Sequence, residues 1–150
     1  MFDDLYTHDV LALSATLKNT RLDAPHGSVR KVSKLCGSWI EVDLKIDGAG
    51  AEARVSDCAL RIQACALGQA SAAILQENII GASLVELREA RDTLEAMLKS
   101  DEDASNSAPS GRFARIEILR GVRAYPPRHT STLLAFKAAV QAFETALESV

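Results

Sequence analysis

The sequence has few cysteines, no excess of basic charge and no long apolar run, and each shortage excludes a class of protein. Its 150 residues hold three cysteines, an odd number that predicts reduced thiols rather than a disulfide framework. Acidic residues outnumber basic ones by 20 to 17, so the net charge of −3 gives no electrostatic reason to bind nucleic acid. The acidic start MFDDLYTHDV lacks the features of a signal peptide, and no run approaches the roughly 20 apolar residues of a membrane span. We expect a soluble, cytoplasmic protein that binds neither nucleic acid nor a membrane.

Motifs of ordinary hydrolytic and phosphate chemistry are missing as well. The sequence has no nucleophile elbow, no phosphate-binding loop and no paired-carboxylate arrangement, which disfavours a conventional hydrolase. A chain of this length can bury roughly 70% of its unfolded surface without disulfides. We therefore predict one domain over residues 1–150.

Alternating polar and apolar residues predict three strands, over residues 28–35, 38–46 and 51–63. The second strand, with IEVDLKI, alternates most clearly. The break at Cys36-Gly37 predicts a tight hairpin turn in which Gly37 takes a positive φ. An antiparallel meander is the simplest way to connect the three strands.

The rest of the chain is predicted to be mainly helical. Periodicity and stop signals indicate helices over residues 2–18, 65–81, 83–100, 113–122 and 131–148. The spacing of Ser83 and Glu86 is that of a capping box. Residues 101–111 lack periodicity and predict a flexible loop, and the two prolines in Tyr125–Arg128 predict an extended connection. The fold class is therefore α+β, a three-stranded antiparallel sheet packed against helices.

Two cysteines are predicted to come together at one end of this sheet. Cys36 lies at the hairpin tip, and Cys65 lies where the third strand gives way to a helix. In a meander followed by a helix packed across it, these two points can lie at the same end. Cys65 would also meet the positive end of a helix dipole, which favours thiolate over thiol. Two thiolates at one end of a sheet would suit a soft metal or sulfur transfer.

His129 and Cys58 have different predicted roles. His129 begins another helix after the proline pair, so it could supply an imidazole ligand if that helix reaches the same end of the sheet. It could equally hydrogen-bond its neighbours. Cys58 alternates with Leu60 and Ile62 and is predicted to be a small buried hydrophobe. The spacings match no local metal motif, so the residues alone leave the metal site open.

At these residues the chain resembles the U-type iron–sulfur cluster scaffold family, which comprises the IscU, SufU and NifU N-terminal domains. The resemblance runs from the N-terminal helix to the last helix and is carried, in order, by LCGS with its alternating strand, CALGQASAA, IIGASL and LRGVRAYPPR. It implies an α+β fold with a long C-terminal helix. It also implies a scaffold, rather than a turnover enzyme, that receives sulfur from a cysteine desulfurase and builds a cluster for apo iron–sulfur proteins.

The resemblance also implies the site residues and the cargo. Cys36 and Cys65 would be thiolate ligands or persulfide acceptors, with His129 as a third ligand. The cargo would be a labile iron–sulfur cluster of the 2Fe–2S type, or iron, with zinc as an alternative. Three ligands per chain would leave an open position, and a homodimer could share a cluster to recover a fourth ligand.

Two family ligands are replaced in this sequence. Ser38 stands where the family usually has an aspartate, and Ser131 stands where a third cysteine usually begins the last helix. A serine hydroxyl is a hard, poorly acidic ligand that replaces neither group well at neutral pH. A second interpretation therefore stays open, in which a degenerate relative acts as a sulfur relay or regulatory partner, with a structural zinc.

Overall fold

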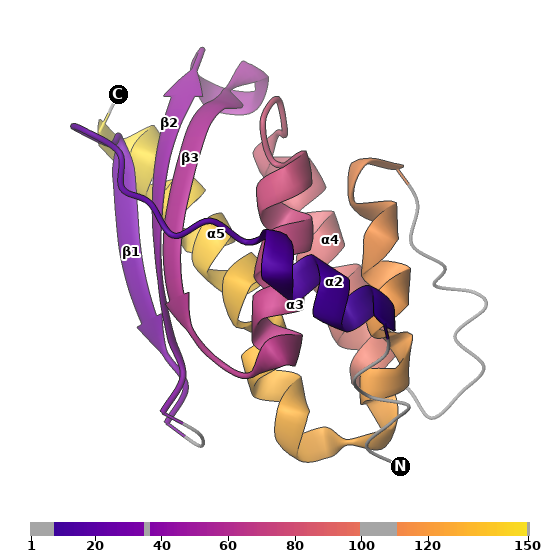
Figure 1. Ribbon diagram of the computed structural model, residues 1–150. Coiled ribbons are helices and arrows are strands. Elements are labelled where there is room, and N and C mark those ends of the chain that lie inside the picture. The colour runs from indigo at the N-terminus through magenta and orange to yellow at the C-terminus, as the bar shows by residue number, and fades with distance from the viewer. Residues whose placement is uncertain (1–7, 35–36, 100–110, 150) are drawn as a thin grey trace.

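A computed structural model describes residues 8–34, 37–99 and 111–149 of the chain (Figure 1). Its sheet has three antiparallel strands in the order β1 (Gly27–Val32), β2 (Trp39–Asp47) and β3 (Arg54–Gln63). The predicted meander is therefore confirmed. Within the loop between β1 and β2, Gly37 has the predicted positive φ, 73°. Cys36 lies outside the described residues.

One α-helix precedes the sheet, a 3-10 turn lies between β2 and β3, and the other helices follow β3. The α-helices are α2 (His8–Thr16), α3 (Ala66–Asn78), α4 (Leu84–Lys99) and α5 (His129–Ser149), and the 3-10 helices are η1 (Gly50–Glu52), η3 (Gly111–Ala124) and η4 (Pro126–Arg128). The predicted α+β class and the long C-terminal helix are confirmed. None of the helices in the described ranges is long and apolar enough to cross a membrane.

The core lies between one face of the sheet and the helices. The alternating residues of β2 that are buried on this face are Ile40, Val42, Leu44 and Ile46. Helix α5 packs against both β1 and β2, and it also contacts α3 and α4 (Figure 1). Its Phe136 and Phe143 are fully buried, so α5 links the sheet layer to the helical layer. This position places the start of α5 beside the start of α3.

The capping box predicted before α4 is present. The Ser83 hydroxyl accepts a hydrogen bond from the Glu86 N–H at 3.1 Å, and the Glu86 carboxylate accepts one from the Ser83 N–H at 3.0 Å. Burial raises the pKa of Glu86, but these bonds and the neighbouring Arg112 outweigh it, so the pKa is lowered. The local sequence therefore fixes where this helix begins.

Two local predictions differ from the structure. Tyr125–Arg128 was predicted to be extended, but Pro126–Arg128 forms a 3-10 turn closed by a 2.9 Å hydrogen bond from the Arg128 N–H to the Tyr125 carbonyl. A proline has the φ of a helical first turn and needs no donor there, so the pair starts a turn as readily as it stops one. The segment after the loop is a 3-10 helix from residue 111 to 124 rather than a shorter helix over 113–122. Residues 101–110 of the predicted loop lie outside the described residues.

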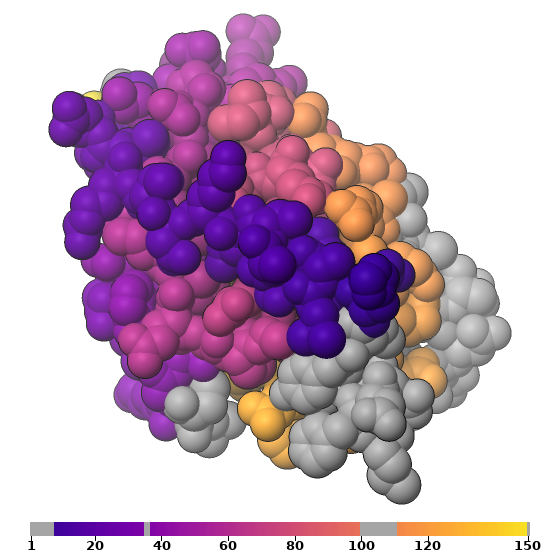
Figure 2. Space-filling model, in the orientation of Figure 1, coloured from indigo at the N-terminus to yellow at the C-terminus, as the bar shows by residue number. Residues whose placement is uncertain are grey.

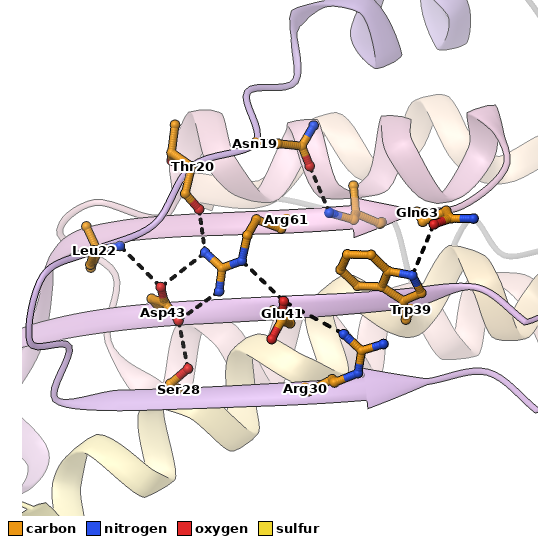
Figure 3. Close-up of polar contacts among 11 residues, drawn as sticks. Asn19, Thr20, Leu22, Ser28, Arg30, Trp39, Glu41, Asp43, Arg61 and Gln63 are labelled. Atoms are coloured by element: carbon orange, nitrogen blue, oxygen red, sulfur yellow. Dashed lines mark hydrogen bonds and ion pairs between the residues drawn. The ribbon is translucent and has the colours of Figure 1, made fainter.

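Residues 17–26 cross the opposite face of the sheet and are held there by a buried ion pair (Figure 3). The Arg61 guanidinium donates two hydrogen bonds of 3.2 Å to the Asp43 carboxylate. Arg61 also donates to the carbonyl of Thr20, and Asp43 accepts from the N–H of Leu22. Figure 2 shows the chain from α2 to the start of β1 as an indigo band on this side of the molecule. The pair thus fixes the connection between α2 and β1.

The protonation of Asp43 links this ion pair to pH. Burial raises its pKa, but hydrogen bonds from Arg61, Ser28 and the Leu22 N–H outweigh burial, so the pKa is lowered below its ordinary value of 3.8. Because the folded pKa lies below the unfolded one, the stabilisation is present above pH 3.8 and is lost as the pH falls through the folded value.

We predict that Asp43→Asn lowers the free energy of unfolding by about 2 kcal/mol at pH 7, because Arg61 loses the carboxylate that accepts two of its hydrogen bonds and retains Glu41 as its charged partner. The difference from wild type should shrink in acid below pH 3.8, where wild-type Asp43 becomes protonated. Urea unfolding at pH 7 and in acid measures both effects. The exposed Asp47→Asn is the matched control, and equal stability of the two variants at pH 7 would contradict the prediction.

Candidate functional site

A pocket of about 290 Å³ opens at one end of the sheet. Three parts of the chain meet there, namely the turn before β2, the junction after β3 and the residue before α5. The lining residues are Gly37, Ser38, Gln63, Ala64, Cys65 and Arg128. The turn and the β3–α3 junction therefore lie at the same end, as the meander predicted, although Cys36 itself is outside the described residues.

Cys65 stands at the N-terminus of α3, as predicted. It is the N-cap residue, with φ −65° and ψ 170°, and its side chain is half-buried. No side-chain hydrogen bond caps the helix, so the sulfur is not used to satisfy the backbone N–H groups of α3. The sulfur instead lies 3.6 Å from the hydroxyl oxygen of Ser131.

The close approach of Cys65 and Ser131 depends on the glycine one turn into α3. A Cβ atom on Gly68 would lie 2.8 Å from the Cβ of Ala64 and 3.2 Å from the backbone oxygen of Ser131. The first distance is shorter than real Cβ contacts allow, and the second is a tight contact with backbone that cannot rotate away. Gly68 thus lets the first turn of α5 rest against the first turn of α3.

The two serines at family ligand positions are both buried at this end. Ser38 is 7% exposed and lines the pocket, and Ser131 is 2% exposed. The Ser131 hydroxyl is also 3.2 Å from the carbonyl oxygen of Arg128, to which it can donate. Both serines therefore lie buried at the same end of the sheet as Cys65.

His129 lies at the start of α5, and one of its ring nitrogens is already engaged. Its Nε2 is 3.0 Å from the carbonyl oxygen of Val122 and 3.2 Å from that of Arg123. Both partners are acceptors, so Nε2 is the donor in these contacts and Nδ1 is the ring nitrogen left for another partner. A histidine that donates one nitrogen to a carbonyl is oriented as many metal-binding histidines are. Any ligand role would therefore fall to Nδ1.

The described residues do not by themselves form a closed metal site. In the described ranges, no three His, Cys, Asp or Glu side chains gather closely enough to hold a metal ion. Cys65 is the thiol at the pocket, and the second thiol of the proposed set, Cys36, is outside those ranges. The neighbouring Ser131 supplies a hydroxyl, which binds iron and zinc poorly at neutral pH.

Cys58 is a packing residue, as predicted. It is half-buried in β3 and lies against the hydrophobic core. Burial and the nearby carboxylates of Asp57 and Asp43 raise the pKa of its thiol to about 12. A thiol with this pKa is almost entirely protonated at neutral pH, so it is a poor nucleophile.

Sequence reasoning missed two features of the site. The side chain of Gln63, which lines the pocket, accepts a 3.2 Å hydrogen bond from the Trp39 ring nitrogen (Figure 3). The Arg30 guanidinium lies 4.5 Å above the same ring, which fixes the ring by a cation–π contact. The strand pairing of Trp39 with Gln63 was the available signal, but it needs the register of β2 and β3.

The fold and the pocket define an α+β domain with a half-buried cysteine at a helix start. A model of the NifU-like N-terminal domain matches residues 6–132, and the chain belongs to this family. The recognised resemblance is thereby confirmed.

Solved structures agree with this assignment. The crystal structure of a nitrogen-fixing NifU-like protein (N-terminal) from Brucella abortus is 38% identical, covers 99% of both chains and has a TM-score of 0.89. A protein described as an iron–sulfur cluster assembly scaffold for the SUF system, from Fervidobacterium islandicum, shares the fold at 24% identity, with a TM-score of 0.77 and coverage of 97% of this chain and 98% of that one. No functionally curated protein matches the chain.

We predict that Cys65 reacts with iodoacetamide at least about tenfold faster than Cys58 in the folded protein, because burial keeps the Cys58 thiol protonated. Peptide mass spectrometry after timed labelling at pH 8 measures both rates. Unfolding in urea should bring the two rates together, which serves as the control. Equal rates in the folded protein would contradict the assignment of Cys58 as a packing residue.

Proposed function

We propose that the protein receives sulfur from a cysteine desulfurase and assembles a labile iron–sulfur cluster for delivery to apo-proteins. The family supports a role as a cluster assembly scaffold. The observation that carries the finer proposal is the position of Cys65, half-buried at a helix start and lining an open pocket with Gly37 and Ser38. These two residues immediately follow Cys36, which belongs to the same proposed site.

The sulfur-transfer step is a thiol–disulfide type of exchange. The Cys65 thiolate attacks the terminal sulfur of the desulfurase persulfide, and a new sulfur–sulfur bond forms. The sulfur–sulfur bond of the donor breaks, and its thiolate leaves with the electron pair. The proton released by the Cys65 thiol goes to the solvent in the open pocket. No external oxidant or reductant is needed, because the transferred sulfur keeps its oxidation state.

The cluster or iron is the cargo of this scaffold. Cys36 and Cys65 would be its thiolate ligands, and His129 would add the lone pair of Nδ1. A 2Fe–2S cluster accepts imidazole in place of thiolate, and a second copy of the chain could complete the ligand set. The protein would act in the cytoplasm as an acceptor and carrier, not as an enzyme that turns over a small substrate.

Anaerobic reconstitution with iron and sulfide tests the scaffold proposal. We predict cluster absorption with near-stoichiometric sulfide per site in the wild type. Cys65→Ser and Cys36→Ser should each abolish most of it, because a hydroxyl does not replace a thiolate ligand. Iron and sulfide analysis after gel filtration measures the cluster content.

Cys58→Ser is the matched control, because Cys58 is a thiol in the same sheet that packs against the core. It should retain the wild-type cluster content, provided that thermal unfolding shows the variant to be folded. Equal cluster content in the Cys36→Ser/Cys65→Ser double variant would overturn the ligand assignment.

A second function, sulfur relay without a stable cluster, is favoured by one observation. Ser131 lies beside Cys65 where the family usually has a third cysteine, and the Ser131 hydroxyl contacts the sulfur. A relay would bind the desulfurase and accept sulfur, yet stay colourless after reconstitution. A pull-down that recovers neither a desulfurase nor a scaffold would contradict it.

A further inference from the structure

Ser131 and Thr132 carry neighbouring hydroxyls at the start of α5, and the hydroxyl of Ser131 also contacts Cys65. Ser131 Oγ lies 3.2 Å and Thr132 Oγ1 lies 2.8 Å from the carbonyl oxygen of Arg128. Both can stabilise the start of α5 in the same way. Ser131 additionally lies 3.6 Å from the Cys65 sulfur. Variants of the two residues can therefore separate the Ser131–Cys65 contact from the bond to the Arg128 carbonyl.

The direction of the Ser131–Cys65 hydrogen bond depends on the sulfur. A Cys65 thiol can donate to Ser131 Oγ while that hydroxyl donates to the Arg128 carbonyl. A Cys65 thiolate has no proton to donate, so the hydroxyl must turn and donate to it. A hydrogen bond to an ionised group is about twice as strong as a neutral one. Ser131 is thus placed to stabilise the thiolate form of Cys65.

The same distance has a meaning for metal binding. With metal–sulfur bonds of about 2.3 Å, two sulfur ligands of one tetrahedral ion lie about 3.8 Å apart. The observed 3.6 Å between the side-chain atoms of Cys65 and Ser131 is close to that separation. Position 131 is therefore placed where a second ligand of an ion on Cys65 would lie. A hydroxyl at this place binds a soft divalent ion weakly, because it stays protonated at neutral pH.

We infer that Ser131 is a specificity-determining residue that sets what Cys65 carries. Its hydroxyl stabilises the Cys65 thiolate that attacks a persulfide donor, and it withholds a further thiolate that, added to those of Cys36 and Cys65, would hold a divalent metal ion tightly. Gly68 is part of the same arrangement, because only its missing Cβ brings the two helix starts together. This inference rests on the proposed sulfur-receiving function and adds the residue that tunes it.

The first test adds the missing thiolate. Ser131→Cys should bind Co²⁺ about a hundredfold tighter than wild type, and the increase should come with stronger thiolate-to-cobalt absorption. Thr132→Cys is the matched control, since it adds a thiol one residue along, at a side chain that bonds to the Arg128 carbonyl, whereas Ser131 contacts the Cys65 sulfur. Equal affinity of wild type and Ser131→Cys, or an equal gain in both variants, would overturn the inference.

The second test removes the hydroxyl. Ser131→Ala should slow the reaction of Cys65 with iodoacetamide about tenfold, the factor expected for one lost hydrogen bond to a charged group. Thr132→Val also loses a hydroxyl bond to the Arg128 carbonyl, but its Cys65 should react with iodoacetamide within about twofold of the wild-type rate. Ser131→Thr keeps a hydroxyl and should restore the rate. Equal slowing in Ser131→Ala and Thr132→Val would show that only the helix start matters and would overturn the inference.

Failure of this inference can be told apart from failure of the proposed function. If Cys65 accepts sulfur and the Ser131 variants behave like their Thr132 controls, the role of Ser131 is wrong and the sulfur-receiving function stands. If Cys65→Ser accepts sulfur as well as wild type, Cys65 is not the acceptor, and both the sulfur-transfer step proposed for Cys65 and this inference are wrong.

Discussion

The contact between the first turns of α3 and α5 is the constraint on which the site depends. Gly68 has no side chain, so the backbone of Ser131 can lie against α3. Helix α5 then continues from this contact along the sheet, where it packs against β1 and β2 (Figure 1). One glycine therefore connects the position of the Cys65 sulfur to the packing of the whole core. A side chain at position 68 would displace α5 from α3 and so change both the surroundings of the Cys65 sulfur and the packing of the core.

The two faces of the sheet have different structural roles. One face packs on α5 and forms the core, with an apolar surface that is independent of pH. The other face holds the chain between α2 and β1 through the Asp43–Arg61 pair, whose stabilisation depends on the ionised carboxylate. The pocket lies at the end of the sheet where the β1–β2 turn and the β3–α3 junction meet. The site is thus supported by the core but remains open to solvent.

Much of this arrangement could be predicted from local sequence. Alternation in IEVDLKI fixed the orientation of β2, the Ser83–Glu86 spacing fixed the start of α4, and Cys65 was expected at a helix start. Each of these signals depends on a few neighbouring residues. The turn at Pro126–Arg128 was predicted wrongly, because a proline pair is compatible with both an extended segment and a first helical turn.

The details of the candidate site could not be predicted in this way. The 3.6 Å contact of Cys65 with Ser131 joins residues 66 positions apart and depends on how two helices pack. The engagement of His129 Nε2 depends on where η3 ends, at carbonyls that no sequence pattern marks. The family resemblance indicated that position 131 belongs to the site, but only the packing shows that its hydroxyl reaches the sulfur.

The central claim is that the sulfur atom of Cys65 accepts the sulfur transferred from the desulfurase. The most direct measurement is peptide mass spectrometry of the protein after incubation with a cysteine desulfurase and cysteine, with persulfides trapped by an alkylating agent. Our account predicts an added sulfur atom on the peptide that contains Cys65 and none on the peptide that contains Cys58. Trapped persulfide on Cys58, or none on Cys65 while the desulfurase itself is loaded, would contradict it.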